Sequence, residues 1–169
     1  MLKSEKNVIT TMILALSLLQ VAMFAVAYRI NDPKEFASMI HQVATNNTMR
    51  LDITILVLFI FIAGIIVSTL LVSAFGFLGV KFFEDEDFKY DFQRIFLIFM
   101  MISSVQPAIS AIKIPFLGNG VPIAYIVAFL IFCGLLIYKT HRILKPLLLS
   151  LLLIGLQLLI IFFVKKGLQ

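Results

Sequence analysis

Charge is scarce along most of this 169-residue chain. Asp, Glu, Lys and Arg make up 14 % of the residues, whereas hydrophobic residues make up 62 %. Five stretches, each at least 18 residues long, contain no charged residue at all. Such runs exclude a water-soluble globular domain, because about 20 apolar residues in a helix cross the roughly 30 Å hydrocarbon core of a membrane. We therefore expect an integral membrane protein.

Groups that carry chemistry are equally scarce. Cys133 is the only cysteine, so no internal disulfide can form. The apolar stretches hold no Asp, Glu, Lys, Arg or His, which ion-coupled carriers and pumps usually need at membrane depth. The motifs of zinc peptidases, serine hydrolases and phosphate-binding loops are missing. The sequence therefore predicts no enzyme, no cofactor and no metal site.

The net charge of +5 does not indicate a nucleic-acid partner. The Lys and Arg residues flank the apolar stretches, as they do in membrane proteins generally, and they form no dense basic stripe with interleaved aromatic residues. The expected surroundings are the lipid bilayer, and the expected protein partner is another membrane protein or a second copy of the chain.

The apolar stretches predict an all-α fold. In lipid only helices and closed barrels satisfy the backbone, and barrel strands would alternate apolar and polar residues. We expect one polytopic transmembrane domain covering residues 1–169. Its five predicted spans are residues 8–28, 53–80, 95–112, 121–138 and 147–164.

The first apolar stretch resembles a cleavable signal peptide in one respect. Lys3 and Lys6 precede it, and Ala25-Val26-Ala27 lies near its end. The uncharged run is longer than a usual signal core, which favours a retained helix.

A short amphipathic helix is predicted over residues 33–45. Asp32 is expected as its N-cap, Pro33 suits the first helical position, and Glu35 completes a D-x-x-E capping box. Asn46-Asn47-Thr48 is expected to end the helix. We interpret the segment as a helix on the membrane surface or over the mouth of the bundle. Its apolar residues form a candidate partner-binding site: Phe36, Met39, Ile40 and Val43.

Two charged segments follow later in the chain. The basic cluster after the fourth span is a second candidate partner-binding site, comprising Lys139, His141, Arg142 and Lys145. The acidic run at residues 84–87 is interleaved with aromatic residues and allows a cation site or a solvated loop anchored by its aromatics at the interface. Four consecutive acids lack the spacing of a calcium loop, which favours the solvated loop.

The most polar place inside the predicted membrane region is the end of the third span. Proline removes one helical hydrogen bond and kinks the chain. The polar residues and the proline of this region are Ser103, Ser104, Gln106 and Pro107. Together with Gln20 in the first span, they either line a cavity or hold helices together, and we favour helix packing. Two prolines and two glycines in residues 115–122 then predict a tight turn between antiparallel spans.

Lys and Arg are slightly more frequent on one side of the predicted topology, and the 139–145 cluster is the strongest local signal. Because such residues prefer the cytoplasmic side, we expect a bacterial cytoplasmic membrane protein with its N-terminus inside and its C-terminus outside.

Residues 81–164 resemble the bacterial branch of the Yip1 family. The resemblance lies in the polar loop at 87–94, Pro107, the Ile-Pro-Phe-Leu-Gly turn at 114–118, and Tyr-Lys-Thr-His-Arg-Ile at 138–143 before a final helix. Residues 1–80 match in topology alone. The resemblance implies five spans and an accessory or scaffold role, in some relatives beside ABC-type exporters in envelope defence. It carries over no catalytic residues.

We therefore expect a non-enzymatic accessory, scaffold or regulatory subunit of a membrane complex. Two alternatives stay open at this point. One is the small-molecule substrate-binding subunit of an uptake transporter, and the other is an immunity protein against a membrane-active peptide.

Overall fold

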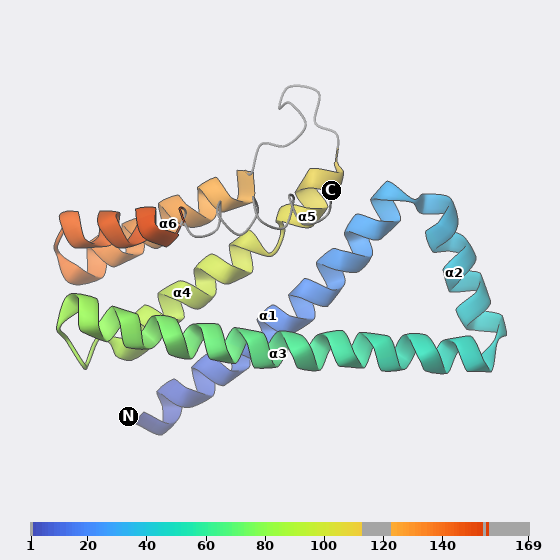
Figure 1. Cartoon of the computed structure of the whole chain (residues 1–169), viewed down its shortest axis with the longest axis horizontal. Helices are drawn as coiled ribbons and strands as arrows, with labels where there is room; N and C mark the ends of the chain where they lie inside the picture. Colours follow the sequence, from blue (N-terminus) through green and yellow to red (C-terminus); the bar gives the residue numbers. More distant parts are fainter. Residues whose placement is uncertain (1, 113–122, 154, 156–169) are drawn as a thin grey trace.

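The computed structural model describes residues 2–112, 123–153 and 155, and these form helices joined by short connections (Figure 1). A further helix over Leu144–Leu153 follows the labelled ones. The labelled helices are α1 (Leu2–Asn31), α2 (Pro33–Thr45), α3 (Asn47–Phe83), α4 (Lys89–Ser103), α5 (Gln106–Ala111) and α6 (Ile123–Thr140).

Four helical segments are long and apolar enough to cross a membrane, so the chain is membrane-embedded and its helical-bundle class is confirmed. They correspond to the first four predicted spans and are Ser4–Asn31, Asn47–Phe83, Lys89–Ala111 and Ile123–Thr140. The fifth predicted span, 147–164, begins within the helix Leu144–Leu153, and most of its remainder lies outside the described residues. The predicted turn within residues 115–122 also lies outside them.

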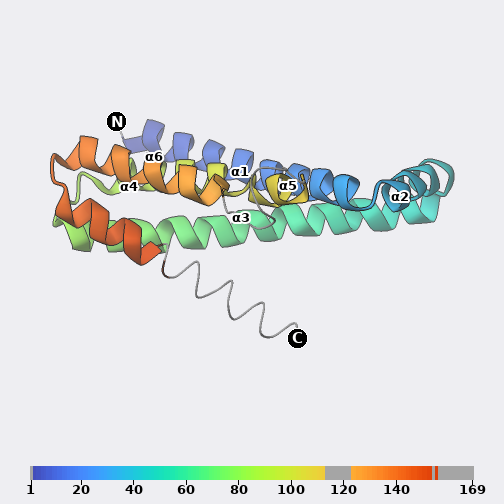
Figure 2. The same ribbon diagram turned by 90° about the horizontal axis from the view of Figure 1, so that it is seen from above.

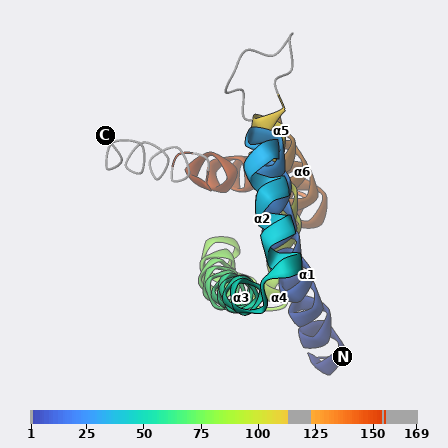
Figure 3. The same ribbon diagram turned by 90° about the vertical axis from the view of Figure 1, so that its right-hand side faces the viewer.

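The helices pack in two layers. Seen from above, α1, α4 and α6 lie on one side, and α3 lies on the other with the Leu144–Leu153 helix (Figure 2). The N-terminal end of α1, the loop at 84–88 and the connection at 141–143 share one end of the molecule (Figure 1). At the opposite end, α1 and α3 diverge and α2 joins them (Figures 1 and 3).

A stripe of small residues on α3 allows its neighbours to approach closely. Gly64 faces Ser17 and Gln20 of α1, whereas Gly76 and Gly79 face α4. A Cβ atom on Gly79 would lie 2.6 Å from the ring of Phe92. Because lipid gives apolar helices no hydrophobic reason to associate, such close backbone approach is a main source of their packing energy.

Phe92 is the centre of an aromatic core at the end of the molecule that holds the 84–88 loop. Its side chain is fully buried, and its ring centroid lies 6.1–6.2 Å from those of Phe83, Phe88 and Phe132. The interpretation that the aromatics around the acidic run anchor a loop at the interface is wrong for Phe83, Phe88 and Phe92. They hold α3, α4 and α6 together instead.

α2 has the bounds predicted from the sequence, Pro33–Thr45, but the side-chain interactions at its ends differ from the predicted ones. Asp32 makes no side-chain cap, and Glu35 accepts a hydrogen bond from the hydroxyl of Tyr28 at 3.3 Å, so the predicted capping box is wrong. The preceding helix runs on to Asn31, so the hydroxyl of Tyr28 in the last turn of α1 reaches Glu35 in the first turn of α2. At the other end a single residue, Asn46, separates the helices, and its side chain caps α3 by accepting from the amide of Thr48 at 3.0 Å.

Replacing Gly79 by alanine tests whether the close contact between α3 and α4 holds the bundle together. The new methyl group meets the buried Phe92 ring, which cannot move without disturbing the aromatic core. We expect Gly79→Ala to lower the free energy of unfolding by about 1–3 kcal/mol, the usual cost of overpacking. Unfolding in a titration of denaturing detergent measures the change.

Gly134→Ala is the matched control. None of the described residues lies within 4 Å of a Cβ atom at Gly134 in α6, so this variant is expected to be neutral or up to about 1 kcal/mol more stable. Equal stability of the two variants would contradict the packing role of Gly79.

Candidate functional site

The third membrane span is interrupted near its end. α4 ends at Ser103, and the helix resumes as α5 after two residues. The hydroxyls of Ser103 and Ser104 donate to backbone carbonyls three residues earlier, at 3.0 and 2.7 Å. Pro107 has no amide hydrogen, so it cannot donate the helical hydrogen bond to the carbonyl of Ser103. The predicted kink is therefore a break that begins before the proline.

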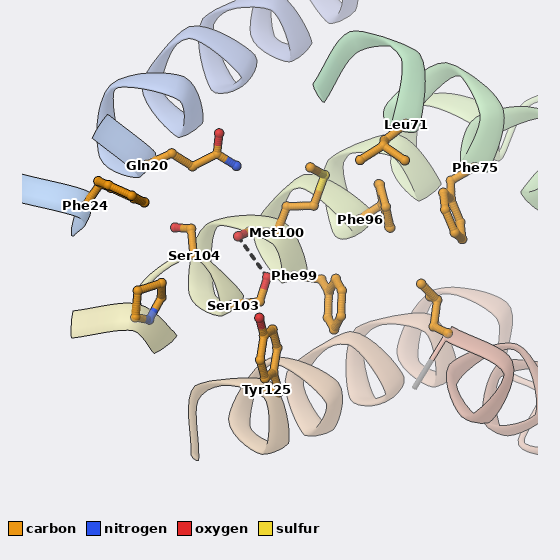
Figure 4. A pocket seen from close by; sticks show the side chains of 12 residues that line it. Gln20, Phe24, Leu71, Phe75, Phe96, Phe99, Met100, Ser103, Ser104 and Tyr125 are labelled. Carbon is orange, nitrogen blue, oxygen red and sulfur yellow. Dashed lines mark hydrogen bonds between the residues drawn. The ribbon is translucent and has the colours of Figure 1, made fainter. Parts of the chain in front are cut away.

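A cavity of about 400 Å³ lies beside this break, between α1, α3, α4 and α6 (Figure 4). Of the five polar-site residues singled out in the sequence, four contribute to its lining: Gln20, Ser103, Ser104 and Pro107. Its volume falls within the range of about 300–1,000 Å³ that is usual for small-molecule sites.

The lining of the cavity is divided by polarity. Tyr125 of α6 points its hydroxyl toward Ser103, and the amide of Gln20 reaches in from α1 (Figure 4). The opposite part of the wall is aromatic, because the rings of Phe75 and Phe96 stack with their centroids 4.3 Å apart. The cavity can therefore hold a molecule with one polar end and an apolar body.

Gln106 has a different role from the other four residues. It is buried, its amide nitrogen donates to the hydroxyl of Ser110 at 3.0 Å, and its amide oxygen accepts from the backbone amide of Ala124 at 2.8 Å. Ala124 lies in the first turn of α6, where backbone amides have no helical acceptor. Gln106 thus caps α6 from α5, which is a helix-packing role.

The predicted docking face of α2 is only partly free. Phe36, Met39 and Val43 are half-buried, and the ring of Phe36 packs edge-to-face on Tyr28 with the centroids 6.0 Å apart. Ile40 is the exposed member, with 51 % of its surface accessible. The apolar stripe of α2 therefore packs mainly toward its own chain, and Ile40 alone points outward.

The predicted basic docking cluster is also partly engaged within the chain. Lys139 pairs with Asp91 at 2.9 Å. Lys145 donates to the carbonyl of Phe82 at 3.1 Å and lies 3.5 Å from Glu84. These contacts join the end of α6 to α4, and the helix Leu144–Leu153 to the end of α3 and the loop that follows it. His141 and Arg142 are exposed, and His141 ends α6 with a φ of 51°.

The acidic run at residues 84–87 forms the loop between α3 and α4. Asp85 accepts hydrogen bonds from the backbone amides of Asp87 at 3.0 Å and Phe88 at 3.3 Å, which shapes the turn into α4. Among the described residues, no group of three or more His, Cys, Asp or Glu side chains is placed to hold a metal ion.

Sequence reasoning did not find Tyr125 or the stacked pair Phe75 and Phe96 as parts of a site. Tyr125 offered a faint signal, because it places a hydroxyl early in an otherwise apolar span. Phe75 and Phe96 offered none, since the sequence contains 17 phenylalanines and nothing in their spacing marks these two.

Comparisons of the chain with protein-family models, curated proteins and solved structures find no match. The resemblance to the Yip1 family therefore stays an expectation drawn from the sequence.

Replacing Gln106 by alanine tests its role as a cap of α6. The variant leaves the amide of Ala124 without this acceptor, and we expect a loss of about 0.5–2 kcal/mol in the free energy of unfolding, the usual cost of removing a helix cap. Gln42→Ala, at an exposed position on α2, is the control and should leave stability unchanged. If the two variants unfold together in a detergent titration, Gln106 is not a cap.

Proposed function

We propose that this chain is a non-enzymatic subunit that binds and regulates another membrane protein. The observation that carries the proposal is the bare first half of α3. We call residues 51–62, which precede the contact of Gly64 with α1, the α3 arm. Six consecutive apolar side chains of the arm, at positions 55–60, are exposed, so none of the described residues covers any side of the helix there.

α3 is covered by neighbouring helices much less than the α4–α5 span is. An 18-residue window of α3 is 11 % buried, whereas the corresponding window of the α4–α5 span is 39 % buried. A helix inside a bundle normally covers at least one stripe of its surface. The α3 arm instead extends beyond the ends of α4 and α6 (Figures 1 and 2).

Specific contacts fix the direction of the arm. α2 joins the diverging ends of α1 and α3, and the Tyr28–Phe36 and Tyr28–Glu35 contacts hold α2 against α1. The Asn46 cap then sets the start of α3. A helix that served only to face lipid would need no such positioning. These contacts therefore favour a seat for an apolar membrane helix of a partner protein.

The class of partner comes from the resemblance noted in the sequence. In the bacterial branch of the Yip1 family, which residues 81–164 resemble, some proteins work beside ABC-type exporters in envelope defence, and we propose such an exporter as the partner. We also propose that the chain lies in a bacterial cytoplasmic membrane with its N-terminus inside. The N-terminal end of α1, the 84–88 loop and the 141–143 connection lie at the same end of the molecule. This arrangement supports the alternating direction of the spans on which the proposed orientation depends.

Shortening two exposed side chains of the arm should weaken partner binding without unfolding the chain. We expect the double variant Leu56→Ala and Phe59→Ala to recover about tenfold less partner in a mild-detergent pull-down from native membranes, because truncation of a contact hot spot costs more than about 1 kcal/mol. Mass spectrometry of the captured proteins measures the change.

The matched control places the same kind of truncation on another lipid-facing surface. Ile126 and Leu130 of α6 are exposed like the arm residues, and their double alanine variant should capture the partner normally. Ile40→Asp in the same assay reports whether α2 adds to the contact. Equal capture by the arm variant and the α6 control would contradict the proposal.

The proposed orientation predicts which loops can be labelled from outside the cell. In a Cys133→Ser background, we expect Gln42→Cys on α2 to react with a membrane-impermeant maleimide in intact cells. Glu86→Cys should react only after the membrane is opened, because its loop lies at the opposite end of the molecule. Gel-shift detection of the labelled chain measures both reactions, and the reverse pattern would place the N-terminus outside.

A further inference from the structure

The cavity beside the α4–α5 break is a built site that the role of a docking subunit does not require. We propose that it binds a neutral, single-headed lipid whose head group is an alcohol, such as a long-chain or isoprenoid alcohol. The inference is independent of the proposed partner protein, because it rests on the lining of this cavity alone.

The lining excludes a charged head group. Among the residues that the structure describes, no Asp, Glu, Lys, Arg or His lines the cavity. An ion taken from water into such surroundings would lose its hydration without gaining a counter-charge, at a cost of several kcal/mol. Phospholipids and ionised fatty acids are therefore poor ligands, and a neutral polar head is required.

The hydrogen-bonding groups select the kind of neutral head. The hydroxyl hydrogens of Ser103 and Ser104 are already donated to the backbone, so these side chains offer oxygen lone pairs to a ligand. The amide of Gln20 and the hydroxyl of Tyr125 make no hydrogen bond among the described residues, and both can donate. A head that accepts from Tyr125 or Gln20 and donates to a serine oxygen satisfies both sides, and an alcohol does this with one atom.

The remaining walls suit an apolar chain. Phe75, Phe96 and Phe99 line the far side of the cavity (Figure 4). Phe24 and Leu71 stand at its rim, and their side chains are 71 % and 39 % exposed. Because these exposed residues belong to membrane-spanning helices, the rim faces the bilayer. A lipid can thus enter sideways, with its head at the serines and its tail along Phe75 and Phe96 toward Leu71 (Figure 4).

Photolabelling of the full chain in liposomes tests the proposal. The probe is a 16-carbon alcohol that carries a diazirine and an alkyne, and labelled peptides are mapped by mass spectrometry. We expect saturable labelling of residues that line the cavity. A methyl ether of the same chain, which accepts but cannot donate a hydrogen bond, should label about three- to tenfold less, as expected for one lost neutral hydrogen bond.

Two variants connect the labelling to the polar wall. Tyr125→Phe keeps the ring and removes the donor, so the apparent affinity for the alcohol should fall about three- to tenfold. Tyr138→Phe makes the same change at a residue that is 73 % exposed and outside the cavity, and it should leave labelling unchanged. Thermal unfolding of both variants in detergent verifies that the fold is intact.

Several results would overturn the proposal. Equal labelling by the alcohol and by the matching alkane would mean that the cavity only accommodates lipid tails. Stronger labelling by a diazirine phosphatidylcholine would mean that a charged head is tolerated. If neither Tyr125→Phe nor Tyr138→Phe changes the labelling, the polar part of the cavity wall has no role in recognising the alcohol.

Discussion

The close approach of α3 to its neighbours is the contact on which the rest of the bundle depends. In lipid, apolar side chains gain nothing by leaving their surroundings, so helices must gain energy from tight packing and hydrogen bonds. Gly76 and Gly79 let α4 reach the backbone of α3, and the amide nitrogen of Gln93 lies 3.5 Å from the carbonyl of Val72. Once these contacts fix α4, Phe92 packs against Phe132 of α6. The position of α4 then also fixes the position of the break after Ser103.

The sequence predicted the helical-bundle class, the places of the first four spans and the range of α2, because these depend on local properties. Apolar runs specify membrane spans, and Pro33 with the apolar spacing of Phe36 and Val43 specifies α2. The caps were less predictable. Asp32 and Glu35 have the spacing of a capping box, but Tyr28 competes for Glu35 across the break. That competition depends on the angle between two helices, which no local pattern encodes.

The candidate site shows the same limit. The polar residues of the third span could be identified, since hydroxyls and a proline are unusual in an apolar run. Which of them face one another could not, because lipid-facing and protein-facing surfaces of a membrane helix have similar compositions. Gln106 and Ser104 are two residues apart, yet one caps α6 and the other lines the cavity. Only the three-dimensional arrangement of α1, α5 and α6 separates these roles.

The two breaks that flank α2 have a mechanical consequence. Asp32 and Asn46 are single-residue joints, so α1, α2 and α3 form one helical path from Leu2 to Phe83 with almost no slack. Hinges of this kind absorb rotation but not extension. A change in the tilt of α1, as a thicker or thinner bilayer would impose, would therefore also act on α2 and on the start of α3.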